Sequence, residues 1–376
     1  MTRHARSSGF LYRFHRGLRF ARAPLLALAL LAPARAAEPP APALHWGALA
    51  PLPVPVGLKG MYAGASEGHA LFAGGSNFPV PPRAGGKKTF HRAVHVRALA
   101  ASEPSSWRTV ADGLPHAMGE GAAATLADGV ACLGGHDGTQ PLATAFVLRW
   151  DARAGALVRR PLPDLPVACA NPAAALAAAR LYVAGGESAS GPLATLWRLD
   201  PRPPETGGHA ARWTALPPPP GPPRFGGILI AVTTPAGPRL LYGGGLPGTP
   251  KSQDDYLRDT WLFDPAKETW SPAAPLPRGA VLAAVLPAGP GHAFVLGGSD
   301  GHDFARMREL GERYRIPADV LHYDAAAGRW STAGTMPLGL VGAAVVRADD
   351  AWLIAGGEYS PGLRTAAVHA LRVRLP

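Results

Sequence analysis

Short apolar segments alternate with turns rich in Gly and Pro along most of this chain, and six of the segments end in a pair of glycines. Segments of this length and composition are typical of buried β-strands rather than helices. The pairs recur at intervals of 51 to 60 residues, as ALFAGG at Gly74-Gly75, ACLGG at Gly134-Gly135, LYVAGG at Gly185-Gly186, LLYGG at Gly243-Gly244, AFVLGG at Gly297-Gly298 and WLIAGG at Gly356-Gly357. A repeat of about 50 residues made of short strands indicates an all-β architecture of four-stranded units.

Other features recur in the same order within each unit. A strand of small residues, such as GAAATLA, precedes the glycine pair, and a strand ending in an aromatic residue or Asp, such as WLFD, follows it. We expect the glycines to allow a sharp turn because they lack Cβ. A Trp, expected to pack between neighbouring units, leads to a Leu-Pro or Met-Pro turn at Trp107, Trp213, Trp270 and Trp330, with Leu157 in its place in the second unit.

The last unit is incomplete, and the missing part stands near the start of the chain. After WLIAGG the sequence ends without a Trp strand, whereas Leu44 to Pro53 (LHWGALAPLP) carries such a strand with no glycine pair of its own. The sequence therefore predicts a six-bladed kelch-type β-propeller over residues 37–376, with its last blade closed by the N-terminal strand. Closure of this kind removes exposed strand edges.

Residues 1–36 have the pattern of a secretory signal peptide. Six Arg precede a short apolar run, Pro24 to Ala32, and Ala34-Arg35-Ala36 matches a cleavage site. The run is too short for a helix that spans a bilayer of about 30 Å. We expect export to the periplasm, with no membrane attachment after cleavage.

Composition changes this picture little once the leader is set aside. Removing the leader's seven Arg from the 37 Lys and Arg leaves 30 basic against 26 acidic residues, so the high pI is no argument for nucleic-acid binding. Cys132 and Cys169 are the only cysteines and lie in apolar segments, which favours buried free thiols over a disulfide. No spacing typical of a zinc or haem site occurs, and we expect neither metal nor cofactor.

Three of the six loops that follow the glycine pairs are unusual. They are SNFPVPPRAGGKKTFH (76–91), the long charged loop of residues 299–317, in which a short helix is expected, and EYSPGLRT (358–365). In a propeller these loops gather at one end of the central channel, where ligands bind.

The sequence here resembles the kelch-type sialic acid mutarotases (N-acetylneuraminate epimerases) and their cyclically permuted relatives. The resemblance is carried by GG-x-NFP…GGKK-x-x-H from Gly74 to His91, by GG-x-DG from Gly297 to Gly301, and by GE-x-x-PG-x-R-[ST] from Gly357 to Thr365. It implies that Glu358 is the catalytic proton acceptor and that Arg364 belongs to the sugar-acid pocket.

These residue types suit the chemistry. Interchange of the anomers of a cyclic sugar acid needs a carboxylate that accepts the proton of the anomeric hydroxyl, and an Arg fork matches the carboxylate of the substrate. The alternative is that Glu358 and Arg364 form an ion pair within their loop. Asn77 is a candidate partner for a sugar hydroxyl or a turn cap, and Arg224 either lines the channel or packs within a blade.

Two other functions remain open at this point. One is a non-catalytic kelch module that binds protein or carbohydrate. The other is a copper-radical sugar oxidase, which needs a Cys linked to a Tyr beside His ligands, whereas neither cysteine stands in a loop that faces the channel. The expected partner is a small sugar acid rather than nucleic acid, and a homodimer is possible.

Overall fold

The structure is a computed structural model that describes residues 41–100, 106–202 and 211–375. The predicted signal peptide lies outside these residues, so it stays a prediction. No helix among the described residues is long and apolar enough to cross a membrane.

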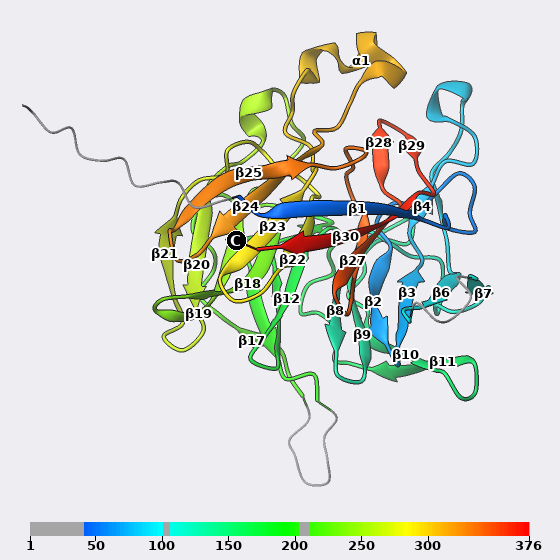
Figure 1. The fold of residues 1–376 in the computed structure, drawn as a ribbon, viewed down its shortest axis with the longest axis horizontal. Coiled ribbons are helices and arrows are strands. Elements are labelled where there is room, and N and C mark those ends of the chain that lie inside the picture. The colour runs from blue at the N-terminus through cyan, green and yellow to red at the C-terminus, as the bar shows by residue number, and fades with distance from the viewer. Residues whose placement is uncertain (1–40, 101–105, 203–210, 376) are drawn as a thin grey trace, which may run out of the picture. The chain divides into compact units, whose positions relative to one another are not determined.

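Six four-stranded antiparallel sheets form the six blades of a β-propeller (Figure 1). Blade 1 contains β2 (Tyr62–Ser66), β3 (His69–Ala73), β6 (Val94–Ala98) and β7 (Arg108–Val110). Blade 2 contains β8 (Ala122–Leu126), β9 (Gly129–Leu133), β10 (Ala145–Asp151) and β11 (Ala156–Pro161). Blade 3 contains β12 (Ala173–Ala177), β13 (Arg180–Ala184), β16 (Leu196–Leu199) and β17 (Thr214–Ala215). The predicted fold class is confirmed.

The other three blades follow the same plan. Blade 4 contains β18 (Ile228–Thr234), β19 (Gly237–Gly243), β20 (Thr260–Asp264) and β21 (Thr269–Ala273). Blade 5 contains β22 (Ala284–Pro287), β23 (His292–Leu296), β24 (Asp319–Asp324) and β25 (Arg329–Thr335). Blade 6 contains β26 (Ala344–Ala348), β27 (Ala351–Ala355), β30 (Val368–Arg374) and β1 (Ala43–Leu49). The first strand named in each blade lines the central channel.

The N-terminal strand completes the last blade, as predicted. β1 pairs antiparallel with β30 over seven residues, from Ala43 opposite Arg374 to Leu49 opposite Val368. The two ends of the described chain therefore lie side by side in one sheet (Figure 1).

A closed ring of backbone hydrogen bonds joins the six blades where their inner strands begin. Each N–H donates to the carbonyl of the corresponding residue in the preceding blade, with N···O distances of 2.6 to 2.9 Å. All six residues have a positive φ between 50° and 67°. They are Gly60, Glu120, Asn171, Gly226, Leu282 and Gly342. A left-handed backbone favours glycine, and glutamate, asparagine and leucine occupy the other three positions of this ring.

The glycine pairs form the predicted turns, with one correction. Both glycines of each turn have positive φ, but in blade 4 they are Gly244 and Gly245 rather than the predicted Gly243-Gly244. Gly243 is the last residue of β19 and pairs with Thr260 of β20. The sequence contains three successive glycines there, and β19 extends one residue further than the pattern of the other five units predicted.

The four recurring tryptophans connect neighbouring blades. The indole N–H of each donates to a carbonyl in the turn that ends the preceding blade. The pairs are Trp107 with Ala50 (3.3 Å), Trp213 with Pro163, Trp270 with Pro217 and Trp330 with Ala274 (2.9 Å each). The predicted packing between units is confirmed.

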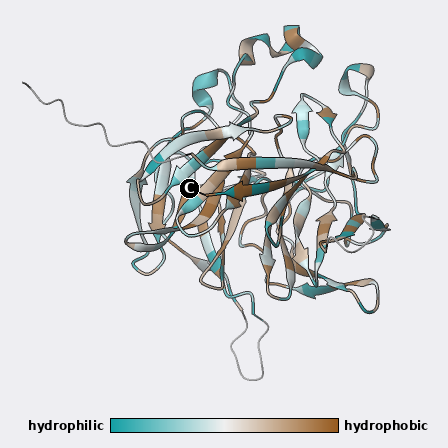
Figure 2. Cartoon of the chain, viewed as in Figure 1, coloured by the Kyte–Doolittle hydropathy of each residue, from teal (hydrophilic) through white to brown (hydrophobic). Residues whose placement is uncertain are grey.

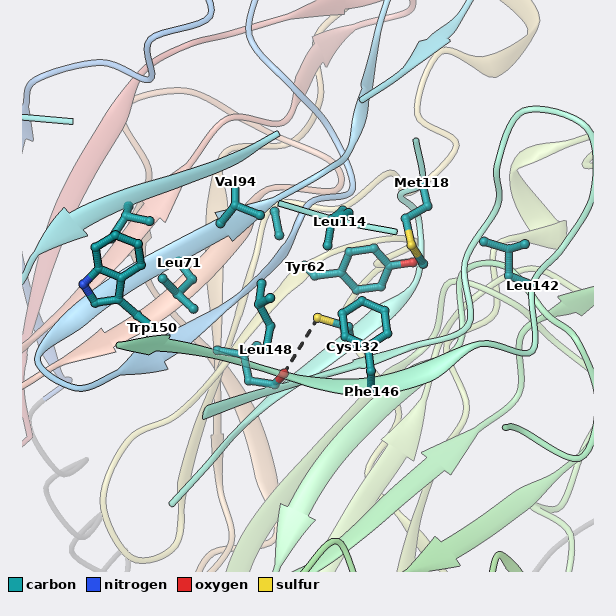
Figure 3. Close-up of a cluster of buried hydrophobic side chains, with 13 residues drawn as sticks. Tyr62, Leu71, Val94, Leu114, Met118, Cys132, Leu142, Phe146, Leu148 and Trp150 are labelled. Atoms are coloured by element: carbon teal, nitrogen blue, oxygen red, sulfur yellow. Dashed lines mark hydrogen bonds between the residues drawn. The ribbon is translucent and has the colours of Figure 1, made fainter. Parts of the chain in front are cut away.

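Apolar side chains fill the spaces between blades, and apolar positions gather along the strands (Figure 2). Figure 3 shows the cluster between blades 1 and 2, in which Tyr62 and Leu71 meet Phe146 and Leu148. Cys132 lies in this cluster, and Cys169 is buried in the next; both are free thiols, as predicted. Burial raises the pKa of Cys169 to about 12, so neither buried thiol is a reactive thiolate at neutral pH.

Candidate functional site

The inner strands of all six blades enclose a channel with a cavity volume of about 380 Å³. Small apolar residues form most of its wall, particularly alanines of β8 and β12. Lys59, Glu120 and Asn171 are the polar lining residues at the end where the hydrogen-bonded ring lies. This end is the mouth of the channel toward the loops that follow the glycine pairs.

The three unusual loops meet at this mouth. The loop of blade 1 contains β4 (Ser76–Asn77), η1 (Pro82–Ala84) and β5 (Thr89–Phe90), and that of blade 5 contains η3 (Phe304–Arg306), the short helix α1 (Met307–Leu310) and η4 (Gly311–Arg313). The loop of blade 6 forms a hairpin of β28 (Glu358–Ser360) and β29 (Leu363–Arg364). The other two-stranded loop, in blade 3, has β14 (Glu187–Ser188) and β15 (Gly191–Pro192), and the loop of blade 4 holds η2 (Gln253–Asp255).

Direct contacts connect the unusual loops. The Ser360 hydroxyl donates to the Gly311 carbonyl at 3.3 Å, and the Arg83 guanidinium lies so close to Gly311 that a Cβ there would be 2.3 Å from it. The helix expected in the loop of blade 5 is present, and it stands at the same end of the propeller as the β28–β29 hairpin (Figure 1).

Glu358 and Arg364 lie opposite each other in the β28–β29 hairpin and form an ion pair. The Arg364 side chain is 2% exposed and lies over the Phe78 ring at 4.8 Å, whereas the Glu358 side chain is 17% exposed. Burial lowers the pKa of Arg364, and the charges of Glu358 and Glu120 oppose this effect. The Arg364 Nε is buried without a hydrogen-bond partner among the described residues.

The ion pair considered as an alternative from the sequence is therefore present, but its setting is not that of a surface salt bridge. The backbone of Glu358 bridges to Val341, immediately before the ring residue Gly342, so the hairpin stands next to the channel mouth, although neither Glu358 nor Arg364 is among the residues that line the cavity. A buried guanidinium contacts this carboxylate, whose side chain keeps part of its surface exposed.

Asn77 and Arg224 are both engaged within the protein. Asn77 is 3% exposed; its amide N–H donates to the Gly57 carbonyl, and its side-chain oxygen lies 2.9 Å from His91 Nε2. Arg224 is 1% exposed and makes a bidentate ion pair with Asp259 at 2.7 Å. These are the packing arrangements that the sequence left open beside the binding roles, and neither side chain is among the residues that line the channel.

A second charged cluster, which the sequence analysis did not single out, lies beside Arg364. Glu120 is 8% exposed; Ser76 Oγ donates to its Oε1 at 3.2 Å, and Lys88 Nζ lies 2.5 Å from the same oxygen. Burial raises the pKa of Glu120, but the charges of Lys59 and Lys88 and the two hydrogen bonds outweigh burial and hold it below its usual value. Aligning the six units would have revealed this residue, because Glu120 stands where three other units have glycine.

Comparisons with known proteins show what part of this chain is similar to. An N-acetylneuraminate epimerase of Yersinia pestis (strain Pestoides F) is 31% identical over 231 residues, which are 55% of this chain and 56% of the relative. An N-acetylneuraminate epimerase of Haemophilus influenzae (strain PittEE) is 27% identical over 230 residues, 55% of this chain and 58% of the relative. The match thus spans little more than half the length of these curated relatives.

Among solved structures, one of a protein named YjhT aligns with a TM-score of 0.45 and 25% identity, covering 57% of this chain and 68% of that chain. No family model matches the chain.

Proposed function

We propose that this protein is an isomerase that interconverts the α and β anomers of N-acetylneuraminic acid, at the channel mouth. The observation that carries the proposal is the partly exposed Glu358 carboxylate, paired with a buried arginine in a hairpin next to the channel mouth. The similarity to N-acetylneuraminate epimerases supports the choice of substrate. A cavity of about 380 Å³ is within the usual size of a small-molecule site.

The reaction requires one proton to leave the sugar and one to return. The anomeric hydroxyl loses its proton, the bond between the anomeric carbon and the ring oxygen breaks, and the ring oxygen gains a proton. The open-chain ketone then rotates and the ring closes from the other face by the reverse steps. In the proposal Glu358 accepts the proton of the anomeric hydroxyl, and water or a second group protonates the ring oxygen.

Arg364 belongs to the same pocket in this proposal. Its guanidinium contacts Glu358 and is packed on Phe78, so it fixes the orientation of the carboxylate before the substrate arrives. Orientation of a proton acceptor before the reaction is one of the larger contributions that an enzyme makes. Asn77 supports the first loop through Gly57 and His91, which keeps Phe78 beside Arg364.

The location of the reaction is a further part of this proposal. The predicted leader of residues 1–36 supports export to the periplasm, where free sialic acid would reach the channel without a membrane contact. A mature N-terminus near Ala37, measured by mass spectrometry of the native protein, tests this part separately.

Proton NMR of freshly released α-N-acetylneuraminic acid, with and without the protein, tests the activity. We expect the approach to anomeric equilibrium to accelerate in proportion to protein concentration. If the sugar binds by calorimetry but equilibrates at the uncatalysed rate, the protein is a carbohydrate-binding module. If neither binding nor acceleration occurs, the proposed substrate is wrong.

A further inference from the structure

Among the described residues, Lys88 and Arg364 near the channel mouth each contact a carboxylate, whereas Lys59 does not. Lys88 contacts Glu120, and Arg364 contacts Glu358. Lys59 is half-buried and lines the channel, and its ammonium makes no hydrogen bond or ion pair within the described residues. It has no direct contact with Glu120, although its charge lowers the pKa of Glu120 at least as strongly as that of Lys88 does.

The backbone of the ring gives the Lys59 side chain its place. Lys59 immediately precedes the ring residue Gly60, and its own N–H and carbonyl are occupied by Ser76, so its main chain is fixed. Its aliphatic stem passes over Gly342, where an added Cβ would lie 2.7 Å from Lys59 Cγ. Glycine at this position of blade 6 leaves room for the lysine, next to the bridge between Val341 and Glu358.

The charges at the mouth favour an anion near Lys59. Within this group of five side chains, Lys59, Lys88 and Arg364 face the two carboxylates of Glu120 and Glu358, an excess of one positive charge. Each carboxylate is in direct contact with one of the other cations, whereas the Lys59 ammonium, which acts on Glu120 through its charge, keeps its own hydrogen-bonding capacity for a ligand. An unpaired cation in a partly desolvated channel attracts anionic ligands more strongly than one at an open surface.

We propose that Lys59 binds the carboxylate of the substrate, whereas Arg364 positions Glu358 and does not contact that carboxylate. This inference rests on the proposed function in taking a sugar acid as the ligand. An ammonium and a carboxylate form a strong, charge-assisted hydrogen bond. A substrate held there by its carboxylate has its anomeric carbon, which bears that carboxylate, near Glu358.

The test compares an acid and its ester on two lysine variants. In Lys59→Met the stem over Gly342 is kept and the charge is lost; in Lys59→Arg the charge is kept. Calorimetry measures the affinities for N-acetylneuraminic acid and for its methyl ester, which has no negative charge. We expect Lys59→Met to weaken binding of the acid by about 10- to 100-fold and to leave the ester unchanged, with partial recovery in Lys59→Arg.

Lys87→Met is the matched control, since Lys87 is an exposed lysine of the neighbouring loop without a partner at the mouth. It should bind the acid as the wild type does. Equal losses for acid and ester in Lys59→Met, or no loss for either, would overturn the inference, because Lys59 would then act on packing or not at all.

Glucuronic and galacturonic acids, with their methyl esters, distinguish failure of this inference from failure of the proposed function. If the wild type does not bind N-acetylneuraminic acid but binds one of these acids in a Lys59-dependent way, the substrate named in the proposed function is wrong. The inference that Lys59 binds a carboxylate would then still hold. If the wild type binds none of the acids, both are overturned.

Discussion

At the scale of single residues, Glu358 is the side chain on which the proposed chemistry depends. Glu358→Gln keeps the size of the side chain but removes its capacity to accept a proton at neutral pH. We expect the catalysed rate of anomer interconversion to fall by about 10² to 10⁴ while the affinity for the sugar changes little. NMR rates and calorimetry on the same preparation measure both.

Glu187 offers a control at the equivalent position of blade 3. It follows the glycine pair there and bridges to Ala170 as Glu358 bridges to Val341, but no arginine pairs with it among the described residues. Glu187→Gln should interconvert anomers at the wild-type rate. A wild-type rate in Glu358→Gln as well would show that Glu358 is not the proton acceptor.

Two buried histidines should make the stability of the protein depend on pH. Burial lowers the pKa values of His95 and His322 to about 4, assisted at His95 by the charge of His91 and at His322 by that of His292, and opposed at His322 by Asp324. Each of these histidines takes up a proton below about pH 6.5 in the unfolded state but only near pH 4 in the folded state. The free energy of unfolding is therefore highest above pH 6.5 and decreases as the pH falls toward 4. The fall is at most about 1.4 kcal/mol per pH unit for each histidine.

Urea unfolding of wild type and His322→Gln at pH 7, 5.5 and 4.5 measures this dependence. We expect the free energy of unfolding of the variant to fall less steeply with decreasing pH than that of the wild type. Parallel curves would mean that His322 takes up its proton in the folded state as readily as in the unfolded chain.

Residues with a recurring sequence context could be predicted, whereas those defined by contacts between blades could not. Glu358 and Arg364 stand in one short motif, so their proximity followed from the sequence. Lys59 and Glu120 are 61 residues apart and come near each other only because the ring brings adjacent blades together, although an alignment of the units would have singled out Glu120. The burial of Arg224 was also undetermined, since its partner Asp259, in the same blade, lies 35 residues away.

At the scale of elements, the Trp strands fix each blade to the one before it. Trp330 donates to the Ala274 carbonyl, whereas the Trp46 Nε1 in β1 is buried without a partner among the described residues. Trp330→Phe should therefore lower the free energy of unfolding by about 1 kcal/mol more than Trp46→Phe does. Chemical denaturation of both variants measures the difference, and equal losses would assign the role of Trp330 to packing alone.

The elements themselves were predictable because their signals are local. Where a strand is followed by two glycines, the sequence indicates the position of the turn. In blade 4 the predicted turn was displaced by one residue, because three successive glycines leave the end of the strand undefined by sequence. The hydrogen-bonded ring had no such signal, since glutamate, asparagine and leucine occupy half of its left-handed positions.

At the scale of the whole molecule, closure depends on seven residue pairs between the two ends of the described chain. β1 covers the edge of β30, and its Leu44 and Trp46 pack with the core between blades 5 and 6. Without β1 the N–H and carbonyl groups of β30 face solvent as an unpaired edge, which is a template for pairing with other chains.

Deletion of Leu44 to Leu52 from the mature protein should therefore cause concentration-dependent aggregation, measured by light scattering, and a lower unfolding temperature. A synthetic peptide of residues 41–53 added in excess should restore the monomer, because the β30 edge is intact and only its partner is missing. Deleting residues 37–41, which precede β1, is the control and should change neither property. The truncated protein could instead stay monodisperse and unfold at the wild-type temperature. Five complete blades and a three-stranded sixth blade would then suffice for a stable monomer, and the N-terminal strand would cover an edge that the fold does not need to protect.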